Sequence, residues 1–361
     1  MIRLGDVATY INGYAFKPED RGEEGLPIIR IQDLTGNAYD LGFYNGEYPK
    51  KVEINDGDIL ISWSASLGVY IWNKGKALLN QHIFKVVFDK VDIDKNYFVY
   101  AVRQKLVEMG MKTHGATMKH IVKKDFDATL IPYPTLGEQA EIAANLNKVS
   151  SIIEARKQEL QLLDNLIKAR FVEMFGDAVE NTMNWPETFI GDKCFVTKLA
   201  GFEYTQYINY EESGDVVMVK AQNVKNGKLN RKELSFISKE VSDSLPRSQL
   251  APGDVVMTYV GANIGDVAVI DDVYEYHLAP NVAKIRPDAE IYNSIYFMYM
   301  LMLLNIYIVK NSADTAKAAL GMERIRNLKV FIPPIELQNQ FVDFVRAVDK
   351  SKLMKPIRAA S

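Results

Sequence analysis

A long helix with a repeating apolar stripe is predicted near the middle of the chain, from Gly137 to Gly176. Apolar residues recur there at alternating steps of four and three, which is the spacing of a heptad seam. Because neither Pro nor Gly occurs between Gln139 and Phe175, we expect one helix, which at about 1.5 Å per residue would reach roughly 55 Å. Such a rod spaces two domains or pairs with another helix. The predicted seam positions are Ile142, Leu146, Val149, Ile153, Arg156, Leu160, Leu163, Ile167, Arg170 and Met174.

The pattern before this helix recurs after it, at a period of about 200 residues. Five matches in the same order indicate an internal repeat. The matched segments are Ile29–Leu34 with Val219–Val224, Gly57–Trp63 with Gly253–Tyr259, Leu79–Val86 with Leu278–Ile285, Tyr97–Tyr100 with Tyr296–Tyr299, and Pro134–Ile142 with Pro333–Phe341.

Each half combines strand and helix patterns. Gly-Asp turns at Gly57 and Gly253 precede runs of β-formers, a turn-then-strand signal. The pattern later becomes helical, from Lys95 to Met111 and from Ile291 to Lys310. We therefore expect an α+β fold with two pseudo-symmetric mixed α/β domains, separated by the long coiled-coil helix and followed by a second, shorter C-terminal helix.

The composition is that of a globular protein. Ile295–Val309 is nearly all apolar, but it is shorter than the roughly 20 residues that a bilayer requires, so a buried helix and no membrane contact are expected. A net charge of −3 restricts any nucleic-acid contact to local patches. The single cysteine, Cys194, and a start without an apolar signal region favour a reducing cytoplasm.

Motifs for catalysis or metal binding are missing. There is neither a P-loop nor a G-x-G-x-x-G, and the G-x-x-x-G from Gly261 to Gly265 is better explained as a turn. The four histidines have no metal-ligand spacing with one another or with Cys194. An isolated nucleophile stays open as an alternative, but a non-catalytic chain without a metal or cofactor of its own is expected.

Basic residues are concentrated at matching places in the two halves. In a slightly acidic chain this distribution is expected if each domain meets a phosphate backbone there. The alternative is a solvated helix face with compensating charges nearby. The candidates are Lys112, Lys119, Lys123 and Lys124 in the first half, and Lys317, Arg324 and Arg326 in the second.

Polar residues at matched strand ends form a second candidate set. Arg, Gln and Asn can make paired hydrogen bonds to base edges in the major groove, so different residues on a shared scaffold could read different sequences. The alternative is that they close turns. The candidates are Arg30 and Gln32 with Lys220, Gln222 and Asn223, and Asn80, Gln81 and His82 with Asn281. Trp63 and Trp72 are interpreted as core residues.

Three motifs resemble a known family. They are the helix start Pro134-Thr135-Leu136-Gly137-Glu138-Gln139, the helix end Lys168-Ala169-Arg170-Phe171-Val172-Glu173-Met174-Phe175-Gly176-Asp177, and the second helix start Pro333-Pro334-Ile335-Glu336-Leu337-Gln338. With the repeat and its spacer, nearly the whole chain resembles the specificity subunit of type I restriction-modification systems.

This resemblance implies a role in an assembly. Residues 1–136 and 179–335 would be target-recognition domains that read the two halves of a bipartite site in double-stranded DNA. Residues 137–178 and 336–361 would be conserved helices that dock methyltransferase subunits. The partner subunits, including the motor and nuclease subunit, would bring S-adenosylmethionine, ATP and Mg.

The resemblance also implies helix contacts. The seam positions Ile142, Leu146, Val149, Ile153, Leu160, Leu163 and Ile167 would pair with Phe341 and Val345 of the second helix. The run from Gln338 to about Leu353 is shorter than the family's second helix, so either the rod is completed by another polypeptide, such as a second copy, or the gene is truncated. A structural adaptor that joins proteins through its coiled coil is the alternative function, and a free-standing DNA enzyme is a third.

Overall fold

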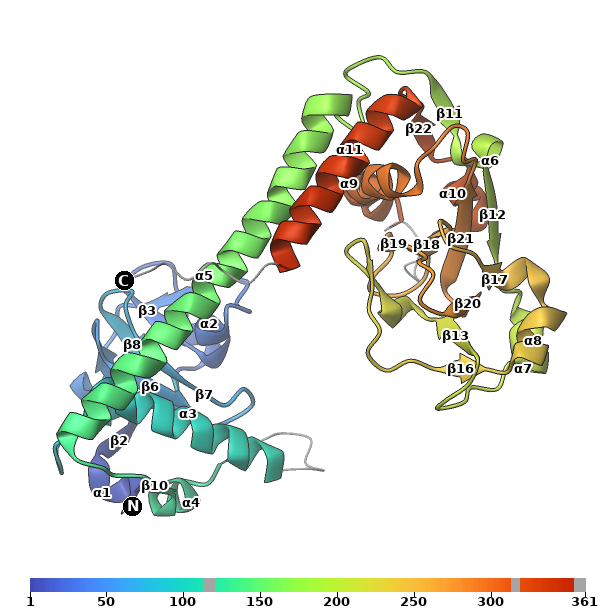
Figure 1. Cartoon of the computed structure of the whole chain (residues 1–361). Helices are drawn as coiled ribbons and strands as arrows, with labels where there is room; N and C mark the ends of the chain where they lie inside the picture. Colours follow the sequence, from blue (N-terminus) through green and yellow to red (C-terminus); the bar gives the residue numbers. More distant parts are fainter. Residues whose placement is uncertain (113–120, 313–318, 354–361) are drawn as a thin grey trace. The chain divides into compact units, whose positions relative to one another are not determined.

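The computed structural model describes residues 1–112, 121–312 and 319–353 (Figure 1). Its contacts divide the chain into two compact units, Met1–Arg156 and Lys157–Ser361. The division falls inside helix α5 (Leu136–Phe175), so each unit contains part of this helix. Each end of α5 packs on its own unit, and the spacer of residues 137–178 as a segment of its own stays a prediction.

Local sequence defines both ends of α5. At its start, the Thr135 backbone N–H donates to Glu138 Oε2 (2.9 Å) and the Glu138 N–H lies 3.4 Å from Thr135 Oγ1, which is a capping box. At its end Gly176 has a left-handed φ of 80°, and its N–H donates to the carbonyl of Val172 (2.8 Å). The predicted continuous helix is confirmed.

Unit 1 (Met1–Arg156) contains two four-stranded sheets with the orders β2-β9-β6-β7 and β4-β3-β8-β5, and the pair β1-β10. The first sheet is antiparallel, and the second contains one parallel pair, β3 with β8. Its strands are β1 (Ile2–Arg3), β2 (Thr9–Asn12), β3 (Leu26–Ile29), β4 (Gly42–Tyr44), β5 (Glu53–Ile54), β6 (Ile59–Ser62), β7 (Gly68–Ile71), β8 (Ala77–Leu79), β9 (Ile83–Val87) and β10 (Leu130–Ile131). Its helices besides α5 are α1 (Leu4–Val7), α2 (Ile31–Thr35), α3 (Lys95–Lys112) and α4 (Lys123–Ala128).

Unit 2 (Lys157–Ser361) follows the same plan. Its sheets have the orders β12-β21-β18-β19 and β16-β13-β20-β17, its parallel pair is β13 with β20, and β11 pairs with β22. Its strands are β11 (Glu187–Phe189), β12 (Cys194–Lys198), β13 (Val216–Val219), β14 (Val224–Lys225), β15 (Lys228–Leu229), β16 (Phe236–Ile237), β17 (Gln249–Leu250), β18 (Val255–Thr258), β19 (Val267–Val269), β20 (Glu275–Leu278), β21 (Val282–Pro287) and β22 (Lys329–Phe331). Its helices are α6 (Ile190–Lys193), α7 (Gly201–Tyr207), α8 (Lys239–Ser244), α9 (Ser294–Ser312), α10 (Met322–Arg326) and α11 (Ile335–Leu353). The predicted internal repeat and α+β fold are confirmed, and the additional pair β14-β15 occurs in unit 2.

The apolar run Ile295–Val309 forms most of α9, as expected of a buried helix. Phe297, Met300 and Leu301 are buried in the main core of unit 2. Across the described ranges, no helix combines the length and the apolar content that a bilayer crossing needs.

A buried glutamine begins the helix at the matched place in each unit. Gln139 donates through Nε2 to the carbonyl of Pro134 (2.8 Å) and accepts from the N–H of Asp94 (2.9 Å). Gln338 donates to the carbonyl of Pro333 (2.9 Å) and accepts from the N–H of Asn293 (2.9 Å). Both side chains are fully buried. These bonds tie the helix start to the turn before α3 or α9, which explains why the Pro-to-Gln pattern repeats.

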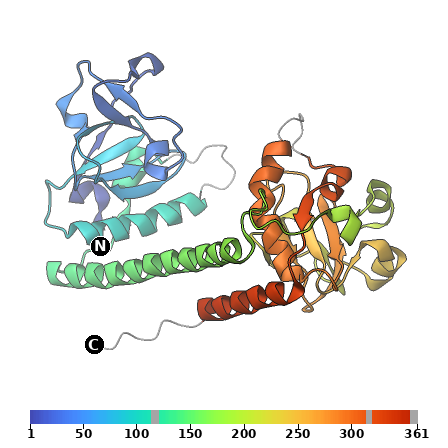
Figure 2. The same ribbon diagram turned by 90° about the horizontal axis from the view of Figure 1, so that it is seen from above.

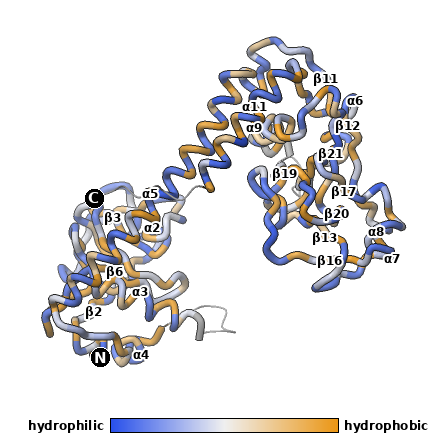
Figure 3. Tube along the Cα trace, in the orientation of Figure 1, coloured by the Kyte–Doolittle hydropathy of each residue, from blue (hydrophilic) through white to orange (hydrophobic). Residues whose placement is uncertain are grey.

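Within unit 2, α11 runs antiparallel to the C-terminal part of α5. Phe341, near the start of α11, packs on Phe171 (ring centroids 5.4 Å apart), and Lys352, near its end, lies 2.7 Å from Asp164. Ile167, Phe341 and Val345 are buried and Leu163 is partly buried in one cluster, so the structure brings these predicted positions together. Apolar and polar residues alternate along both helices (Figure 3).

The most buried positions near the end of α5 lie one residue beyond the predicted seam, whose last two members, Arg170 and Met174, are partly buried. These buried residues are Phe171 and Phe175. A straight helix has 3.6 residues per turn, so its buried stripe drifts away from a strict seven-residue repeat.

Candidate nucleic-acid interface

Arg30 is held inside unit 1 by its neighbours. Its Nε donates to Asp33 Oδ2 (3.0 Å), and its Nη2 donates to the carbonyl of Asp40. The hydrogen bond to Asp33 is the main cause that raises the pKa of Arg30. The side chain is largely buried, so the prediction that it reads bases is corrected: Arg30 stabilises the turn at the start of α2.

Asn223 stabilises the equivalent turn in unit 2. Its Oδ1 accepts from the N–H of Lys220 (3.1 Å), and its Nδ2 donates to the carbonyl of Asn230 (2.9 Å). Because it is buried, Asn223 is also corrected from base reader to turn residue. Lys220 Nζ donates to Ser235 Oγ (2.9 Å), which holds it against its own unit.

The glutamines of this set are placed differently. Gln32 and Gln222 occupy matched positions and both side chains are exposed. They stay candidates for contact with DNA.

The other polar set lies on the loops that lead into β9 and β21. Gln81 and Asn281 are exposed, and Asn80 Oδ1 accepts from the N–H of Gln81 (2.9 Å). His82 and Asn281, at matched positions, both have a left-handed φ of 70°. The structure therefore brings this set to one end of the sheet β2-β9-β6-β7 in unit 1 and to the same end of the sheet β12-β21-β18-β19 in unit 2.

The structure adds two exposed residues to that sheet end. Asn12 ends β2 opposite Phe84, and Lys198 ends β12 opposite Ala283. Phe84 and Ala283 are matched by the repeat, so strand pairing makes Asn12 and Lys198 equivalent. The sequence carries one signal for this pair that the five matched segments do not include: Leu4-Gly5-Asp6 recurs as Ile190-Gly191-Asp192 at an offset of 186, which is also the offset between Asn12 and Lys198.

The basic residues are partly engaged in internal contacts. Lys123 Nζ lies 2.6 Å from Asp127 Oδ2, and Arg326 donates to the carbonyl of Val196 (3.1 Å). Lys124 and Arg324 are exposed. Lys112 is the last residue of α3, whereas Lys119 and Lys317 lie outside the described residues. The basic patch stays a prediction, weakened at Lys123 and Arg326 because each already has a partner.

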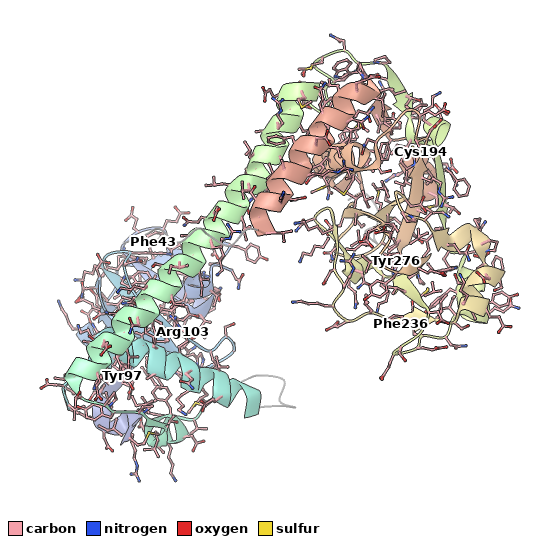
Figure 4. The ribbon with its side chains drawn as sticks, viewed as in Figure 1. Phe43, Tyr97, Arg103, Cys194, Phe236 and Tyr276 are labelled. Atoms are coloured by element: carbon pink, nitrogen blue, oxygen red, sulfur yellow. The ribbon has the colours of Figure 1, made fainter. Side chains whose placement is uncertain are left out.

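An apolar groove lies on unit 1 along α3 and the N-terminal part of α5. It has a volume of about 660 Å³ and includes Tyr97, Tyr100, Ile142 and Leu146; Figure 4 labels Tyr97 at its lining. The two helices run side by side (Figure 2), and Tyr100 donates to Asn147 Oδ1 (2.8 Å). The predicted interface residues Val149 and Ile153 are exposed on the same helix, and Leu160 is half-buried.

Reactive groups are scarce in the described structure. Burial raises the pKa of the Cys194 thiol, labelled in Figure 4, to about 12, so it stays protonated at neutral pH and is a poor nucleophile. Among residues 1–112, 121–312 and 319–353, no three His, Cys, Asp or Glu side chains are placed to hold a metal ion.

Comparisons with known proteins agree with this architecture. A family model described as the type I restriction modification DNA specificity domain matches residues 1–164 and 184–360, one match on each repeat. The chain is 24% identical to the type I restriction enzyme EcoBI specificity subunit of Escherichia coli, over 94% of this chain and 77% of that protein. It is 23% identical to the MjaVIII specificity subunit of Methanocaldococcus jannaschii, over 97% and 85%.

A solved structure shares the fold. The type I restriction-modification S subunit from M. genitalium aligns with a TM-score of 0.53 at 16% identity, over 97% of this chain and 89% of that one. The family match spans both repeats and most of the long helix. The chain belongs to the family of type I restriction-modification DNA specificity subunits.

Proposed function

We propose that this chain reads the two halves of a bipartite double-stranded DNA site, one with each unit, and docks methyltransferase subunits through α5 and α11. The observation that carries the proposal is that two four-stranded sheets of matching strand order recur in both units, with different polar side chains at matched strand ends. A shared scaffold with different hydrogen-bonding groups is what two different half-sites require.

The docking role rests on the apolar residues of α5 in unit 1. Ile142, Leu146 and Val149 are exposed, and apolar side chains in a contiguous groove are typical of a protein interaction site. S-adenosylmethionine, ATP and Mg would then be carried by the methyltransferase subunits and the motor subunit. A second copy of this chain is the other occupant that the proposal allows.

Methylation mapping tests the DNA-reading role. Cells that carry the complete system are compared with cells that lack only this gene, and the methylated motifs are read across the genome. We expect one motif of two half-sites with a fixed gap to disappear. An unchanged set of motifs, with the partner subunits expressed, would contradict the proposal.

Light scattering tests the docking role. The purified chain is sized alone and after mixing with the methyltransferase subunit. A mass increase only with that subunit supports docking, and a mass above that of one chain in the chain alone indicates self-association. No association in either measurement contradicts docking through the helices.

A further inference from the structure

In each unit, the same two backbone hydrogen bonds hold an aromatic residue just after a central strand of the sheet, β6 in unit 1 and β18 in unit 2. The Trp63 N–H donates to the carbonyl of His82 (3.2 Å), and the Trp63 carbonyl accepts from the N–H of Ile121 (3.0 Å). In unit 2, the Tyr259 N–H donates to the carbonyl of Asn281 (2.9 Å), and its carbonyl accepts from the N–H of Leu320 (2.8 Å). The two aromatic residues are therefore held at equivalent points.

The side chains around these hydrogen bonds differ between the units. In the first cluster, Trp63 Nε1 donates to Asn12 Oδ1 (3.3 Å) and the indole meets the His82 ring edge-on at 5.0 Å. In the second, Lys198 Nζ lies 5.4 Å from the ring centroid of Tyr259. We call Asn12, Trp63 and His82 the first strand-end cluster, and the second cluster consists of Lys198, Tyr259 and Asn281.

Each aromatic ring packs against the core of its own unit. Trp63 stacks on Phe84 of the core, with 5.5 Å between ring centroids and 22° between planes, and both Trp63 and Tyr259 are only half-buried. A ring fixed in this way offers a rigid apolar face at a low entropy cost. Burial raises the pKa of Tyr259, so its hydroxyl stays protonated at neutral pH and can donate.

The backbone at His82 and Asn281 supports a functional role. Both have a φ of 70°, a region that glycine adopts freely and that costs other residues roughly 1 kcal/mol or more. Among residues other than glycine, Asn and His are enriched at this φ. Strained polar residues that are kept at one place in two copies of a fold are typical of a binding site.

The chemistry distinguishes base edges from phosphate. Asn12, Trp63 and His82 include no Lys or Arg, so phosphate neutralisation is not what the two clusters share. Asn can pair with the N6 and N7 groups of adenine, Lys can donate to O6 and N7 of guanine, and an aromatic ring can contact the thymine methyl. The two clusters therefore offer different sets of donors and acceptors from the same position.

We infer that the two strand-end clusters contact base edges and set part of the specificity of each half-site. The inference rests on the proposed DNA-reading function and names the residues that perform it. The first cluster reads one half-site and the second cluster reads the other.

The test transfers the second cluster's side chains to the first. The triple variant Asn12→Lys, Trp63→Tyr, His82→Asn of the full chain is expressed with the complete system, and methylated motifs are mapped. We expect altered bases in one half-site, with the other half-site and the gap unchanged. The milder variants Asn12→Ala and Lys198→Ala each shorten one exposed side chain, and each should lower methylation of its own half-site's sequence on the order of tenfold.

Asn73→Ala is the matched control, because exposed Asn73 follows β7 at the opposite end of the same β-hairpin. An unchanged motif in the triple and both single variants would overturn the inference. A loss that is equal for all sequences would also overturn it, since that result indicates phosphate contact. Failure of the proposed function appears separately, as the absence of any motif that depends on the unchanged chain.

Discussion

The helical faces of the two units are built alike but covered differently. Ile142, Leu146 and Val149 of unit 1 are 39%, 37% and 53% exposed. The equivalent residues of unit 2, which are Phe341, Val345 and Val348, are 0%, 3% and 6% exposed. In unit 2 the face between α9 and α11 is covered by the C-terminal part of α5, through Ile167, Phe171 and Phe175.

An apolar stripe on a helix therefore identifies a face that can be buried, but it does not identify the element that covers this face. Tyr97 of unit 1 and Tyr296 of unit 2 are both buried, but only Tyr296 is packed by aromatic rings of α5, with centroids 5.5 Å and 4.7 Å away. The groove of unit 1 thus has the form of a core that lacks a third helix among the described residues. A helix with apolar residues at the spacing of Ile167, Phe171 and Phe175 would fit it.

The largest effect is expected when the cover of unit 2 is removed. Phe171→Ala deletes a fully buried ring that touches Phe175, Tyr296 and Phe341, so the free energy of unfolding of unit 2 should fall by about 3 to 5 kcal/mol. Denaturant unfolding with hydrogen exchange assigns the loss to a unit. The control is Val172→Ala, the exposed next residue. A loss below about 1 kcal/mol for Phe171→Ala would contradict the conclusion that α5 covers the face between α9 and α11.

The buried glutamines should respond alike in the two units. Gln139→Ala and Gln338→Ala each remove partners from buried backbone groups, and each should cost about 1 to 3 kcal/mol of unfolding free energy. Gln338 makes one further bond, to the carbonyl of Ile291 (2.9 Å), so its loss should be the larger. The exposed residues Glu141 and Gln340, at matched positions on the two helices, provide alanine controls. Very different costs would show that the helix starts are not equivalent.

Much of this fold could be predicted from the sequence because the repeat carried the information. The matched segments gave the strand-and-helix plan of both units, and the absence of Gly and Pro between Gln139 and Phe175 predicted the helix. The buried stripe after Ile167 could not be predicted from a strict heptad, since packing on α9 and α11 selects Phe171 and Phe175. Periodicity also could not show that Ile142 is exposed and Phe341 buried.

The candidate site was predicted only in part. His82 and Asn281 were found through the repeat, and the structure places them at one sheet end. Arg30 and Asn223 were mistaken for base readers, because residues that can pair with a base can also satisfy a turn. Asn12 and Lys198 were missed, since the recurrence of Gly5-Asp6 as Gly191-Asp192 at their offset of 186 is short and lies outside the five matched segments.

A smaller difference between the units is expected in acid. His277 of β20 is buried where unit 1 has Leu78, and burial lowers its pKa. It stays neutral in the folded state while the unfolded state takes up a proton below about pH 6.5, so stability is kept above that pH and lost as the pH falls. The loss between pH 7 and pH 5 is at most about 2 kcal/mol. Unfolding of the His277→Leu variant should lack this component, and an unchanged pH dependence would exclude His277 as its source.

The smallest effect on folding is expected at the groove of unit 1. The size of this effect distinguishes a surface that binds a partner from a poorly packed part of the core. Leu146→Ala should change the unfolding free energy of the isolated chain by less than about 1 kcal/mol, because the side chain is already partly solvated. Val345→Ala, at the matched position in unit 2, should cost more because Val345 is buried. If the groove binds a helix of another subunit, Leu146→Ala should nevertheless weaken the complex in light scattering with the methyltransferase subunit. A large loss of stability in the isolated chain, without any effect on assembly, would mean that the groove is part of the core of unit 1.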